Sequence, residues 1–81
     1  MAKPLRTEAE LIALLNVALR RTDVCAGVTV NAIHQVEDKT ANWDADALRG
    51  AGVPVSPDCK RVFTAAKSDL RKMYDLRGMT N

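Results

Sequence analysis

The sequence predicts a small α+β domain with the order helix, strand, strand, helix, in which two helices pack on one face of an antiparallel hairpin. Between residues 28 and 48, apolar and polar side chains alternate on both sides of a short polar segment, as in two strands joined by a turn. Before and after this region, apolar residues recur at helical spacing behind residues that commonly begin helices. An alternative arrangement adds residues 53–55 as a short third strand.

The second predicted strand, residues 42–48, has the cleaner alternation. Trp43, Ala45 and Ala47 fall on one face, and the polar residues between them fall on the other. Trp43 is the only tryptophan and the largest apolar side chain, so we expect it to anchor the core beneath both helices. Residues 37–40 are too polar to pack and are predicted to form the turn.

The first predicted strand, residues 28–36, alternates less regularly. His34 falls on its apolar face, whereas Ile33 falls on its polar face and is expected to point outward. A bulge near residues 32–34 would correct the phase, because one extra residue exchanges the faces of the strand beyond it. Leu48, at the end of the second strand, is also expected to be apolar and outward-facing.

Each predicted helix begins with a recognisable cap. Thr7 and Glu10 have the spacing of a capping box, and Ser56 stands before a proline, which is a common helix start. The first helix is expected to end near Thr22 and the second near Gly78. The two apolar stripes consist of Leu11, Leu14, Leu15, Ala18 and Leu19 in the first helix and of Cys59, Val62, Phe63, Ala66, Leu70, Met73 and Tyr74 in the second.

The 81 residues are expected to form one domain with mobile ends at 1–6 and 78–81. The hydrophobic content of 47% is typical of a folded rather than a disordered protein. The longest apolar run is too short to cross a membrane, and acidic residues interrupt the segment that would otherwise resemble a signal peptide. We therefore expect a cytoplasmic protein without a membrane partner, in which Cys25 and Cys59 are reduced and form no disulfide framework.

The charges divide the chain into an acidic hairpin and a basic C-terminal half. Residues 37–46 contain four acidic residues and one lysine, and from Arg49 onward seven basic residues outnumber three acidic ones. A basic helix can follow nucleic-acid phosphates, so the second helix offers a candidate nucleic-acid-binding face. The residues of this basic face are Lys60, Arg61, Lys67, Arg71 and Lys72.

No catalytic, cofactor-binding or metal site is predicted. Cys59, near a helix start, could form a reactive thiolate, but it also begins an apolar stripe, as a buried cysteine would. His34 is the only histidine, and no second ligand stands at a spacing typical of zinc sites. Asp44 and Asp46 share a strand face without the apolar surroundings that would move their pKa values apart for acid–base catalysis.

These observations support two functional hypotheses. The leading one is a non-catalytic interaction protein that forms a homodimer through the hairpin edge or the uncovered sheet face, because a two-stranded sheet is marginally stable alone. Ile33 and Leu48 are its expected contact residues. The alternative is a weak nucleic-acid-binding module that uses the basic face of the second helix. An enzyme that depends on a thiol or a metal is the least favoured class.

Overall fold

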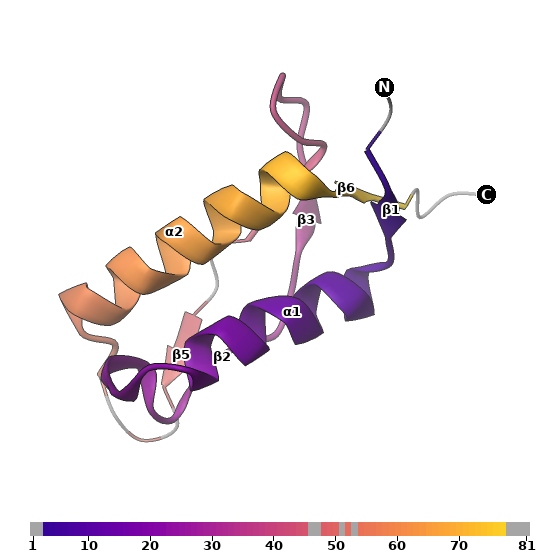
Figure 1. The fold of residues 1–81 in the computed structure, drawn as a ribbon. Helices are drawn as coiled ribbons and strands as arrows, with labels where there is room; N and C mark the ends of the chain where they lie inside the picture. The colour runs from indigo at the N-terminus through magenta and orange to yellow at the C-terminus, as the bar shows by residue number, and fades with distance from the viewer. Residues whose placement is uncertain (1–2, 46–47, 51, 53, 78–81) are drawn as a thin grey trace.

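A computed structural model describes residues 3–45, 48–50, 52 and 54–77. Figure 1 shows two helices side by side in one layer, running in opposite directions, with short strands behind them. The mixture of helices and antiparallel strands that the sequence predicts is confirmed. The elements in chain order are β1 Leu5–Arg6, α1 Glu8–Arg20, a 3-10 helix η1 Asp23–Cys25, β2 Val28–Val30, β3 His34–Gln35, β4 Trp43–Asp44, β5 Leu48–Gly50, α2 Pro57–Met73 and β6 Asp75–Leu76.

Both helices begin at the predicted caps. The Glu10 amide donates to Thr7 Oγ1 at 3.2 Å and the Thr7 amide donates to Glu10 Oε1 at 2.9 Å, which completes the capping box. The Cys59 amide donates to Ser56 Oγ at 3.1 Å at the start of α2. Helix α2 ends at Met73, earlier than the predicted end near Gly78, because the backbone becomes extended at Tyr74 and continues into β6.

The hairpin consists of two short ladders that share one register. Strand β2 pairs with β5, with Val30 opposite Leu48, and β3 pairs with β4, with His34 opposite Asp44. The same number of residues separates the two ladders on each side, so neither side holds a net extra residue and the predicted bulge near 32–34 is wrong. Residues 46–47, which the sequence assigns to the second strand, lie outside the described residues.

The expected outward orientation of Ile33 is wrong. Its side chain is only 8% exposed and belongs to the core, whereas its neighbours Ala32 and His34 are exposed. The reason is that the ladder is interrupted before His34, which releases the chain from strict alternation. The Ile33 amide instead donates to Glu8 Oε2 at 3.3 Å, in the first turn of α1, so this part of the chain faces the helices.

Trp43 lies at the centre of the core, as predicted. Its side chain is fully buried, as is that of Ala45, and its indole Nε1 donates to the Tyr74 carbonyl at 3.0 Å. A buried indole N–H needs an acceptor, so this bond fixes Trp43 against the residue that ends α2. The third residue of the predicted inward face, Ala47, lies outside the described residues. The remaining buried core residues include Leu11, Leu15, Leu19, Val28, Val30, Phe63 and Leu76.

The expectation of reduced cysteines is wrong, because Cys25 and Cys59 form a disulfide across a sequence separation of 34 residues. Both cysteines are buried, and the bond joins η1 to the first turn of α2. It therefore holds the C-terminal end of α1 close to the N-terminal end of α2. Disulfides persist in oxidising compartments and are rare in the cytosol, so this bond does not fit the expected cytoplasmic location.

At the opposite end of the helices, β1 and β6 form a parallel pair that the sequence did not predict. Leu5 pairs with Asp75 and Arg6 with Leu76, and the Arg77 amide donates to the Arg6 carbonyl at 2.8 Å. The segment 1–6, expected to be mobile, thus supplies a strand that joins the start of α1 to the end of α2. Residues 1–2 and 78–81 lie outside the described residues.

The alternative third strand at 53–55 falls partly outside the described residues, because Val53 is not among them, and Pro54 and Val55 are not in a strand. Val55 is half-buried and packs against the core. In the described part of the chain, no helix is both long enough and apolar enough to cross a lipid bilayer.

Replacement of Trp43 by alanine should lower the free energy of unfolding by about 3–5 kcal/mol, because it leaves a cavity at the centre of the core and removes the donor to Tyr74. Urea denaturation followed by circular dichroism measures this loss. Leu5→Ala is the control, since Leu5 is 58% exposed. A loss below about 1 kcal/mol in Trp43→Ala would contradict a central anchoring role.

Removal of the disulfide by the double substitution Cys25→Ala and Cys59→Ala should lower the free energy of unfolding by about 3–4 kcal/mol, because the open chain gains conformational entropy when it unfolds. The same denaturation experiment, performed on the wild type with and without dithiothreitol, should show that the reduced wild type resembles the double variant. Equal midpoints for the oxidised wild type and the double variant would show that the bond adds no stability.

Candidate interaction surface

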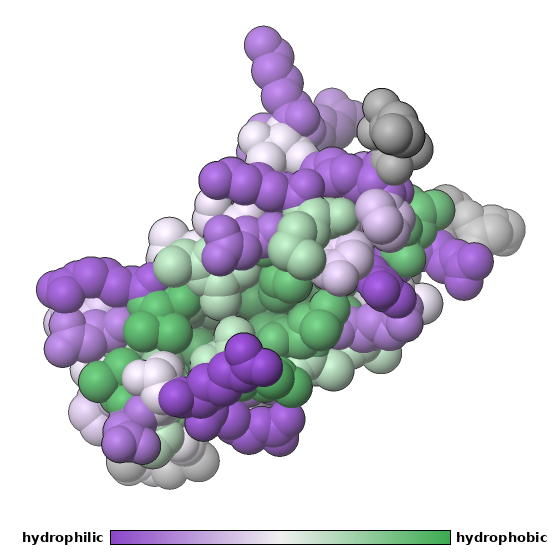
Figure 2. Space-filling view, viewed as in Figure 1, coloured by the Kyte–Doolittle hydropathy of each residue, from purple (hydrophilic) through white to green (hydrophobic). Residues whose placement is uncertain are grey.

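An apolar hollow lies between α1 and α2 on the face of the helices that points away from the strands. Figure 2 shows it as a band of hydrophobic residues between the two helices, bordered by hydrophilic ones. Two adjoining hollows share Leu14 and Val17, which places these two residues at its centre. The apolar lining is completed by Ala13, Ala18, Ala66, Leu70 and Tyr74, and the charged border by Arg6, Glu10, Arg21 and Asp69.

The hollow exists because the apolar stripe of α1 is wider than the surface that covers it. Leu11, Leu15 and Leu19 are fully buried against the strands and α2. Leu14 and Val17, on the adjacent side of the helix, are 37% and 38% exposed. Leu14 belongs to the apolar stripe that the sequence predicts, so this stripe is not buried across its whole width. An apolar stripe that is broader than its intramolecular contact leaves side chains available to a partner.

The border of the hollow carries charges of both signs. At one end, the Arg6 guanidinium lies 3.7 Å from Glu10 Oε2 and 4.8 Å from the centre of the Tyr74 ring. The Thr7 amide hydrogen bond, aided by nearby arginines, holds the pKa of the Glu10 carboxyl below its ordinary value, so Glu10 is a carboxylate at neutral pH. Arg21 and Asp69 border the other end.

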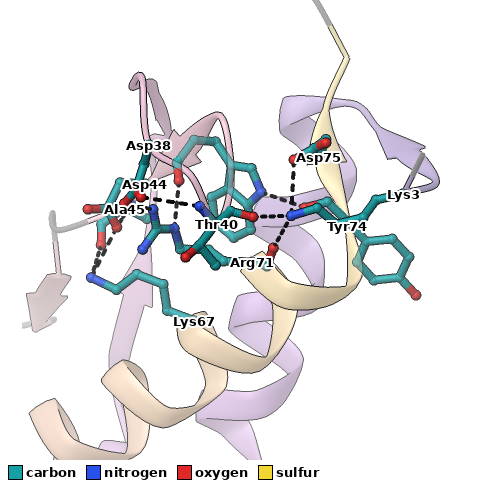
Figure 3. Close-up of polar contacts among 10 residues, drawn as sticks. Lys3, Asp38, Thr40, Asp44, Ala45, Lys67, Arg71, Tyr74 and Asp75 are labelled. Atoms are coloured by element: carbon teal, nitrogen blue, oxygen red, sulfur yellow. Dashed lines mark hydrogen bonds and ion pairs between the residues drawn. The ribbon is translucent and has the colours of Figure 1, made fainter. Parts of the chain in front are cut away.

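Two of the five residues of the basic face predicted for nucleic-acid binding are used inside the chain (Figure 3). Lys67 donates to the Ala45 carbonyl at 3.0 Å and lies 3.2 Å from Asp44 Oδ1. Arg71 donates to the Trp43 carbonyl at 2.9 Å and also forms an ion pair at 2.8 Å with Asp38. These two side chains are less than one fifth exposed. They hold α2 to the hairpin.

The other three residues of the basic face are exposed. Arg61 forms an ion pair with Asp58 at 2.8 Å, one turn earlier on α2, and both side chains are mostly in solvent. Such exposed pairs contribute little to stability. Lys60 and Lys72 are also exposed. The structure therefore does not present the five predicted cations as one accessible surface.

Two acidic residues of the hairpin, Asp38 and Asp44, act as partners of α2. The Arg71 hydrogen bond holds the pKa of the Asp38 carboxyl below its ordinary value. Burial alone would raise the pKa of the Asp44 carboxyl, but the Ala45 amide and Lys67 outweigh it, and the pKa is lowered. Both groups are therefore carboxylates at neutral pH. In the part of the chain that the structure describes, no three His, Cys, Asp or Glu side chains are grouped to hold a metal ion.

Two asparagines that the sequence analysis did not single out bind backbone groups across the fold. The Asn16 side chain, on α1, donates to the Val30 carbonyl at 3.0 Å and accepts from the Val30 amide at 2.8 Å. The Asn42 side chain makes the same pair of contacts with Leu76, at 3.0 and 2.7 Å. Each side-chain amide thus replaces a neighbouring strand. The only sequence signal was a polar residue that interrupts an apolar run.

The two predicted contact residues of the hairpin do not form a surface. Ile33 is buried, and Leu48 is half-buried and packs against the core. His34 is exposed on β3, and the thiol proposed for Cys59 is absent because this cysteine is in the disulfide. Exposed apolar side chains instead meet at Leu14 and Val17.

No family model, no curated protein and no solved structure matches this chain.

Acid should destabilise the protein through Asp38 and Asp44. Because the folded state lowers the pKa of both carboxyls, their contribution is complete above the unfolded value of 3.8 and is lost as the pH falls through the folded values. Thermal melting from neutral pH down to about pH 2 should show a steeper loss in the wild type than in the double variant Asp38→Asn, Asp44→Asn. Glu37→Gln, on the same turn, is the control and should keep the wild-type slope. Parallel pH profiles for the wild type and the double variant would contradict this role.

Proposed function

We propose that the chain is a small, non-catalytic interaction domain that binds a second copy of itself through the hollow between α1 and α2. The observation that carries the proposal is the pair Leu14 and Val17, both more than one third exposed at the centre of an apolar hollow. Exposed apolar surface with a charged border is characteristic of protein–protein contact sites. No cofactor is needed for this function.

The helix face is a better candidate for self-association than the hairpin edge. On β2, the backbone groups of Val30 are bonded to the Asn16 side chain. On the other side of the hairpin, Arg71 and Lys67 bind the carbonyls of Trp43 and Ala45. These side chains occupy some of the backbone groups that a further strand would need. The proposal therefore replaces Ile33 and Leu48 as contact residues.

Nucleic-acid binding by α2 is the alternative function, and it has less support. It would depend on the exposed cations Lys60, Arg61 and Lys72, because Lys67 and Arg71 are engaged with the hairpin. The acidic partners Asp38 and Asp44 lie beside these two residues and reduce the positive charge of the surface.

Self-association should be strongly weakened by Leu14→Glu, because a carboxylate at the centre of the hollow would be buried without a partner. Sedimentation velocity over a concentration series up to high micromolar should show a reversible dimer for the wild type. Leu14→Glu should weaken it at least tenfold, which corresponds to ~1.4 kcal/mol.

Val24→Glu is the matched control, because Val24 is 44% exposed but lies in η1 and does not line the hollow. It should dimerise like the wild type. A wild type that stays monomeric would overturn the proposed function. A dimer that Leu14→Glu leaves intact would show that the copies contact each other through a surface other than the hollow.

A further inference from the structure

We infer that two copies meet through antiparallel α1 helices, related by a two-fold axis at the midpoint between Leu14 and Val17. This inference rests on the proposed self-association and specifies its geometry. The residues of α1 and of its C-cap that line or border the hollow recur at spacings of three, one, three, one and three, a pattern that is the same from both ends. They are Glu10, Ala13, Leu14, Val17, Ala18 and Arg21.

A surface that meets its own copy across a two-fold axis must be complementary to itself. Antiparallel alignment about this midpoint places Leu14 against the partner's Val17. It places alanine against alanine in the next pair, and Glu10 against the partner's Arg21 in the outermost pair. Each class of side chain therefore meets a suitable one, with apolar contacts at the centre and ion pairs at the ends.

The chemistry of α1 allows a close contact of this kind. Ala13 and Ala18 flank the central pair and are small enough to let two helix backbones approach. Helix α1 has 13 residues, which is a length of about 20 Å. A contact of this length is at the small end of protein interfaces, so we expect a weak, reversible dimer.

Charge selects the antiparallel arrangement and a second copy as the occupant. A parallel pair of α1 helices would oppose Glu10 to the partner's Glu10 and Arg21 to the partner's Arg21. In the antiparallel pair, each Glu10 carboxylate meets the partner's Arg21 guanidinium, so the dimer contains two outer ion pairs. The Glu10 side chain is 51% exposed, and Arg21, which caps the end of α1, is also exposed. Both groups are therefore accessible to a partner.

Within one chain, Glu10 and Arg21 are too far apart to interact directly. They are eleven positions apart, which is ~16 Å along a helix and about twice the Debye length of ~8 Å at physiological ionic strength. Any energetic coupling between the two positions in dimerisation must therefore come from contacts between copies. This makes a double-mutant cycle a specific test.

The experiment compares the dimer dissociation constants of the wild type, Arg21→Glu, Glu10→Gln and the double variant by sedimentation. Glutamine is chosen at position 10 because it can complete the same capping box with Thr7, so the start of α1 is preserved. Arg21→Glu should weaken the dimer at least tenfold by opposing carboxylates in both outer pairs. Adding Glu10→Gln should recover most of this loss, although Glu10→Gln alone weakens the wild-type dimer.

Arg20→Glu is the matched control, because Arg20 is exposed at the same helix end but does not border the hollow. It should leave the dissociation constant within about twofold of the wild type, and circular dichroism should show that all variants are folded. Suppose that Leu14→Glu disrupts the dimer but that Glu10→Gln does not restore dimerisation of Arg21→Glu. This result would overturn the antiparallel arrangement and leave the proposed function standing. A monomeric wild type would overturn both the antiparallel arrangement and the proposed function. If that monomer bound an unrelated amphipathic helix, the occupant of the hollow would be a different protein and not a second copy.

Discussion

The attachment of the two helices to each other at both ends is the constraint on which the rest of the structure depends. At one end, the Cys25–Cys59 disulfide joins the segment after α1 to the first turn of α2. At the other end, β1 and β6 pair side by side, and Lys3 binds the Arg71 carbonyl, the Thr40 carbonyl and Asp75 (Figure 3). A helix pair fixed at both ends presents a hollow of constant shape, which reduces the entropy lost when a partner binds.

The hairpin is held by side chains of other elements as well as by its own ladders. Its two ladders are short, and a two-stranded sheet of this size is marginal alone. Asn16, Lys67 and Arg71 reach from the helices to backbone groups of the strands, and Trp43 reaches back to the end of α2. Each of these hydrogen bonds gives a partner to a backbone group that would otherwise lose its hydrogen bonds to water on burial. The cations of α2 are therefore part of the fold.

Local signals in the sequence predicted the features that depend on neighbouring residues. The caps at Thr7 and Ser56 and the burial of Trp43 follow from short spacings and from alternation, and the structure confirms them. The disulfide and the β1–β6 pair join residues that are far apart in sequence, and no local pattern specifies such a pairing. The alternation pattern places Ile33 on the wrong face because it assumes an unbroken ladder. The hollow could not be predicted, because the part of an apolar helix stripe that stays exposed depends on which other elements pack against it.

The disulfide also determines how the molecule would respond to mechanical force. The whole hairpin lies between Cys25 and Cys59, inside a covalently closed loop. Tension applied at Lys3 and Arg77 would first load β1 and β6 along their length, because these strands are parallel and would be pulled in opposite directions. After they separate, the force would pass from one sulfur to the other and bypass the loop. Only the residues outside the loop could extend, by about 3.3–3.6 Å each. Once the bonds of Trp43 to Tyr74 and of Asn42 to Leu76 break, the hairpin would carry no tension.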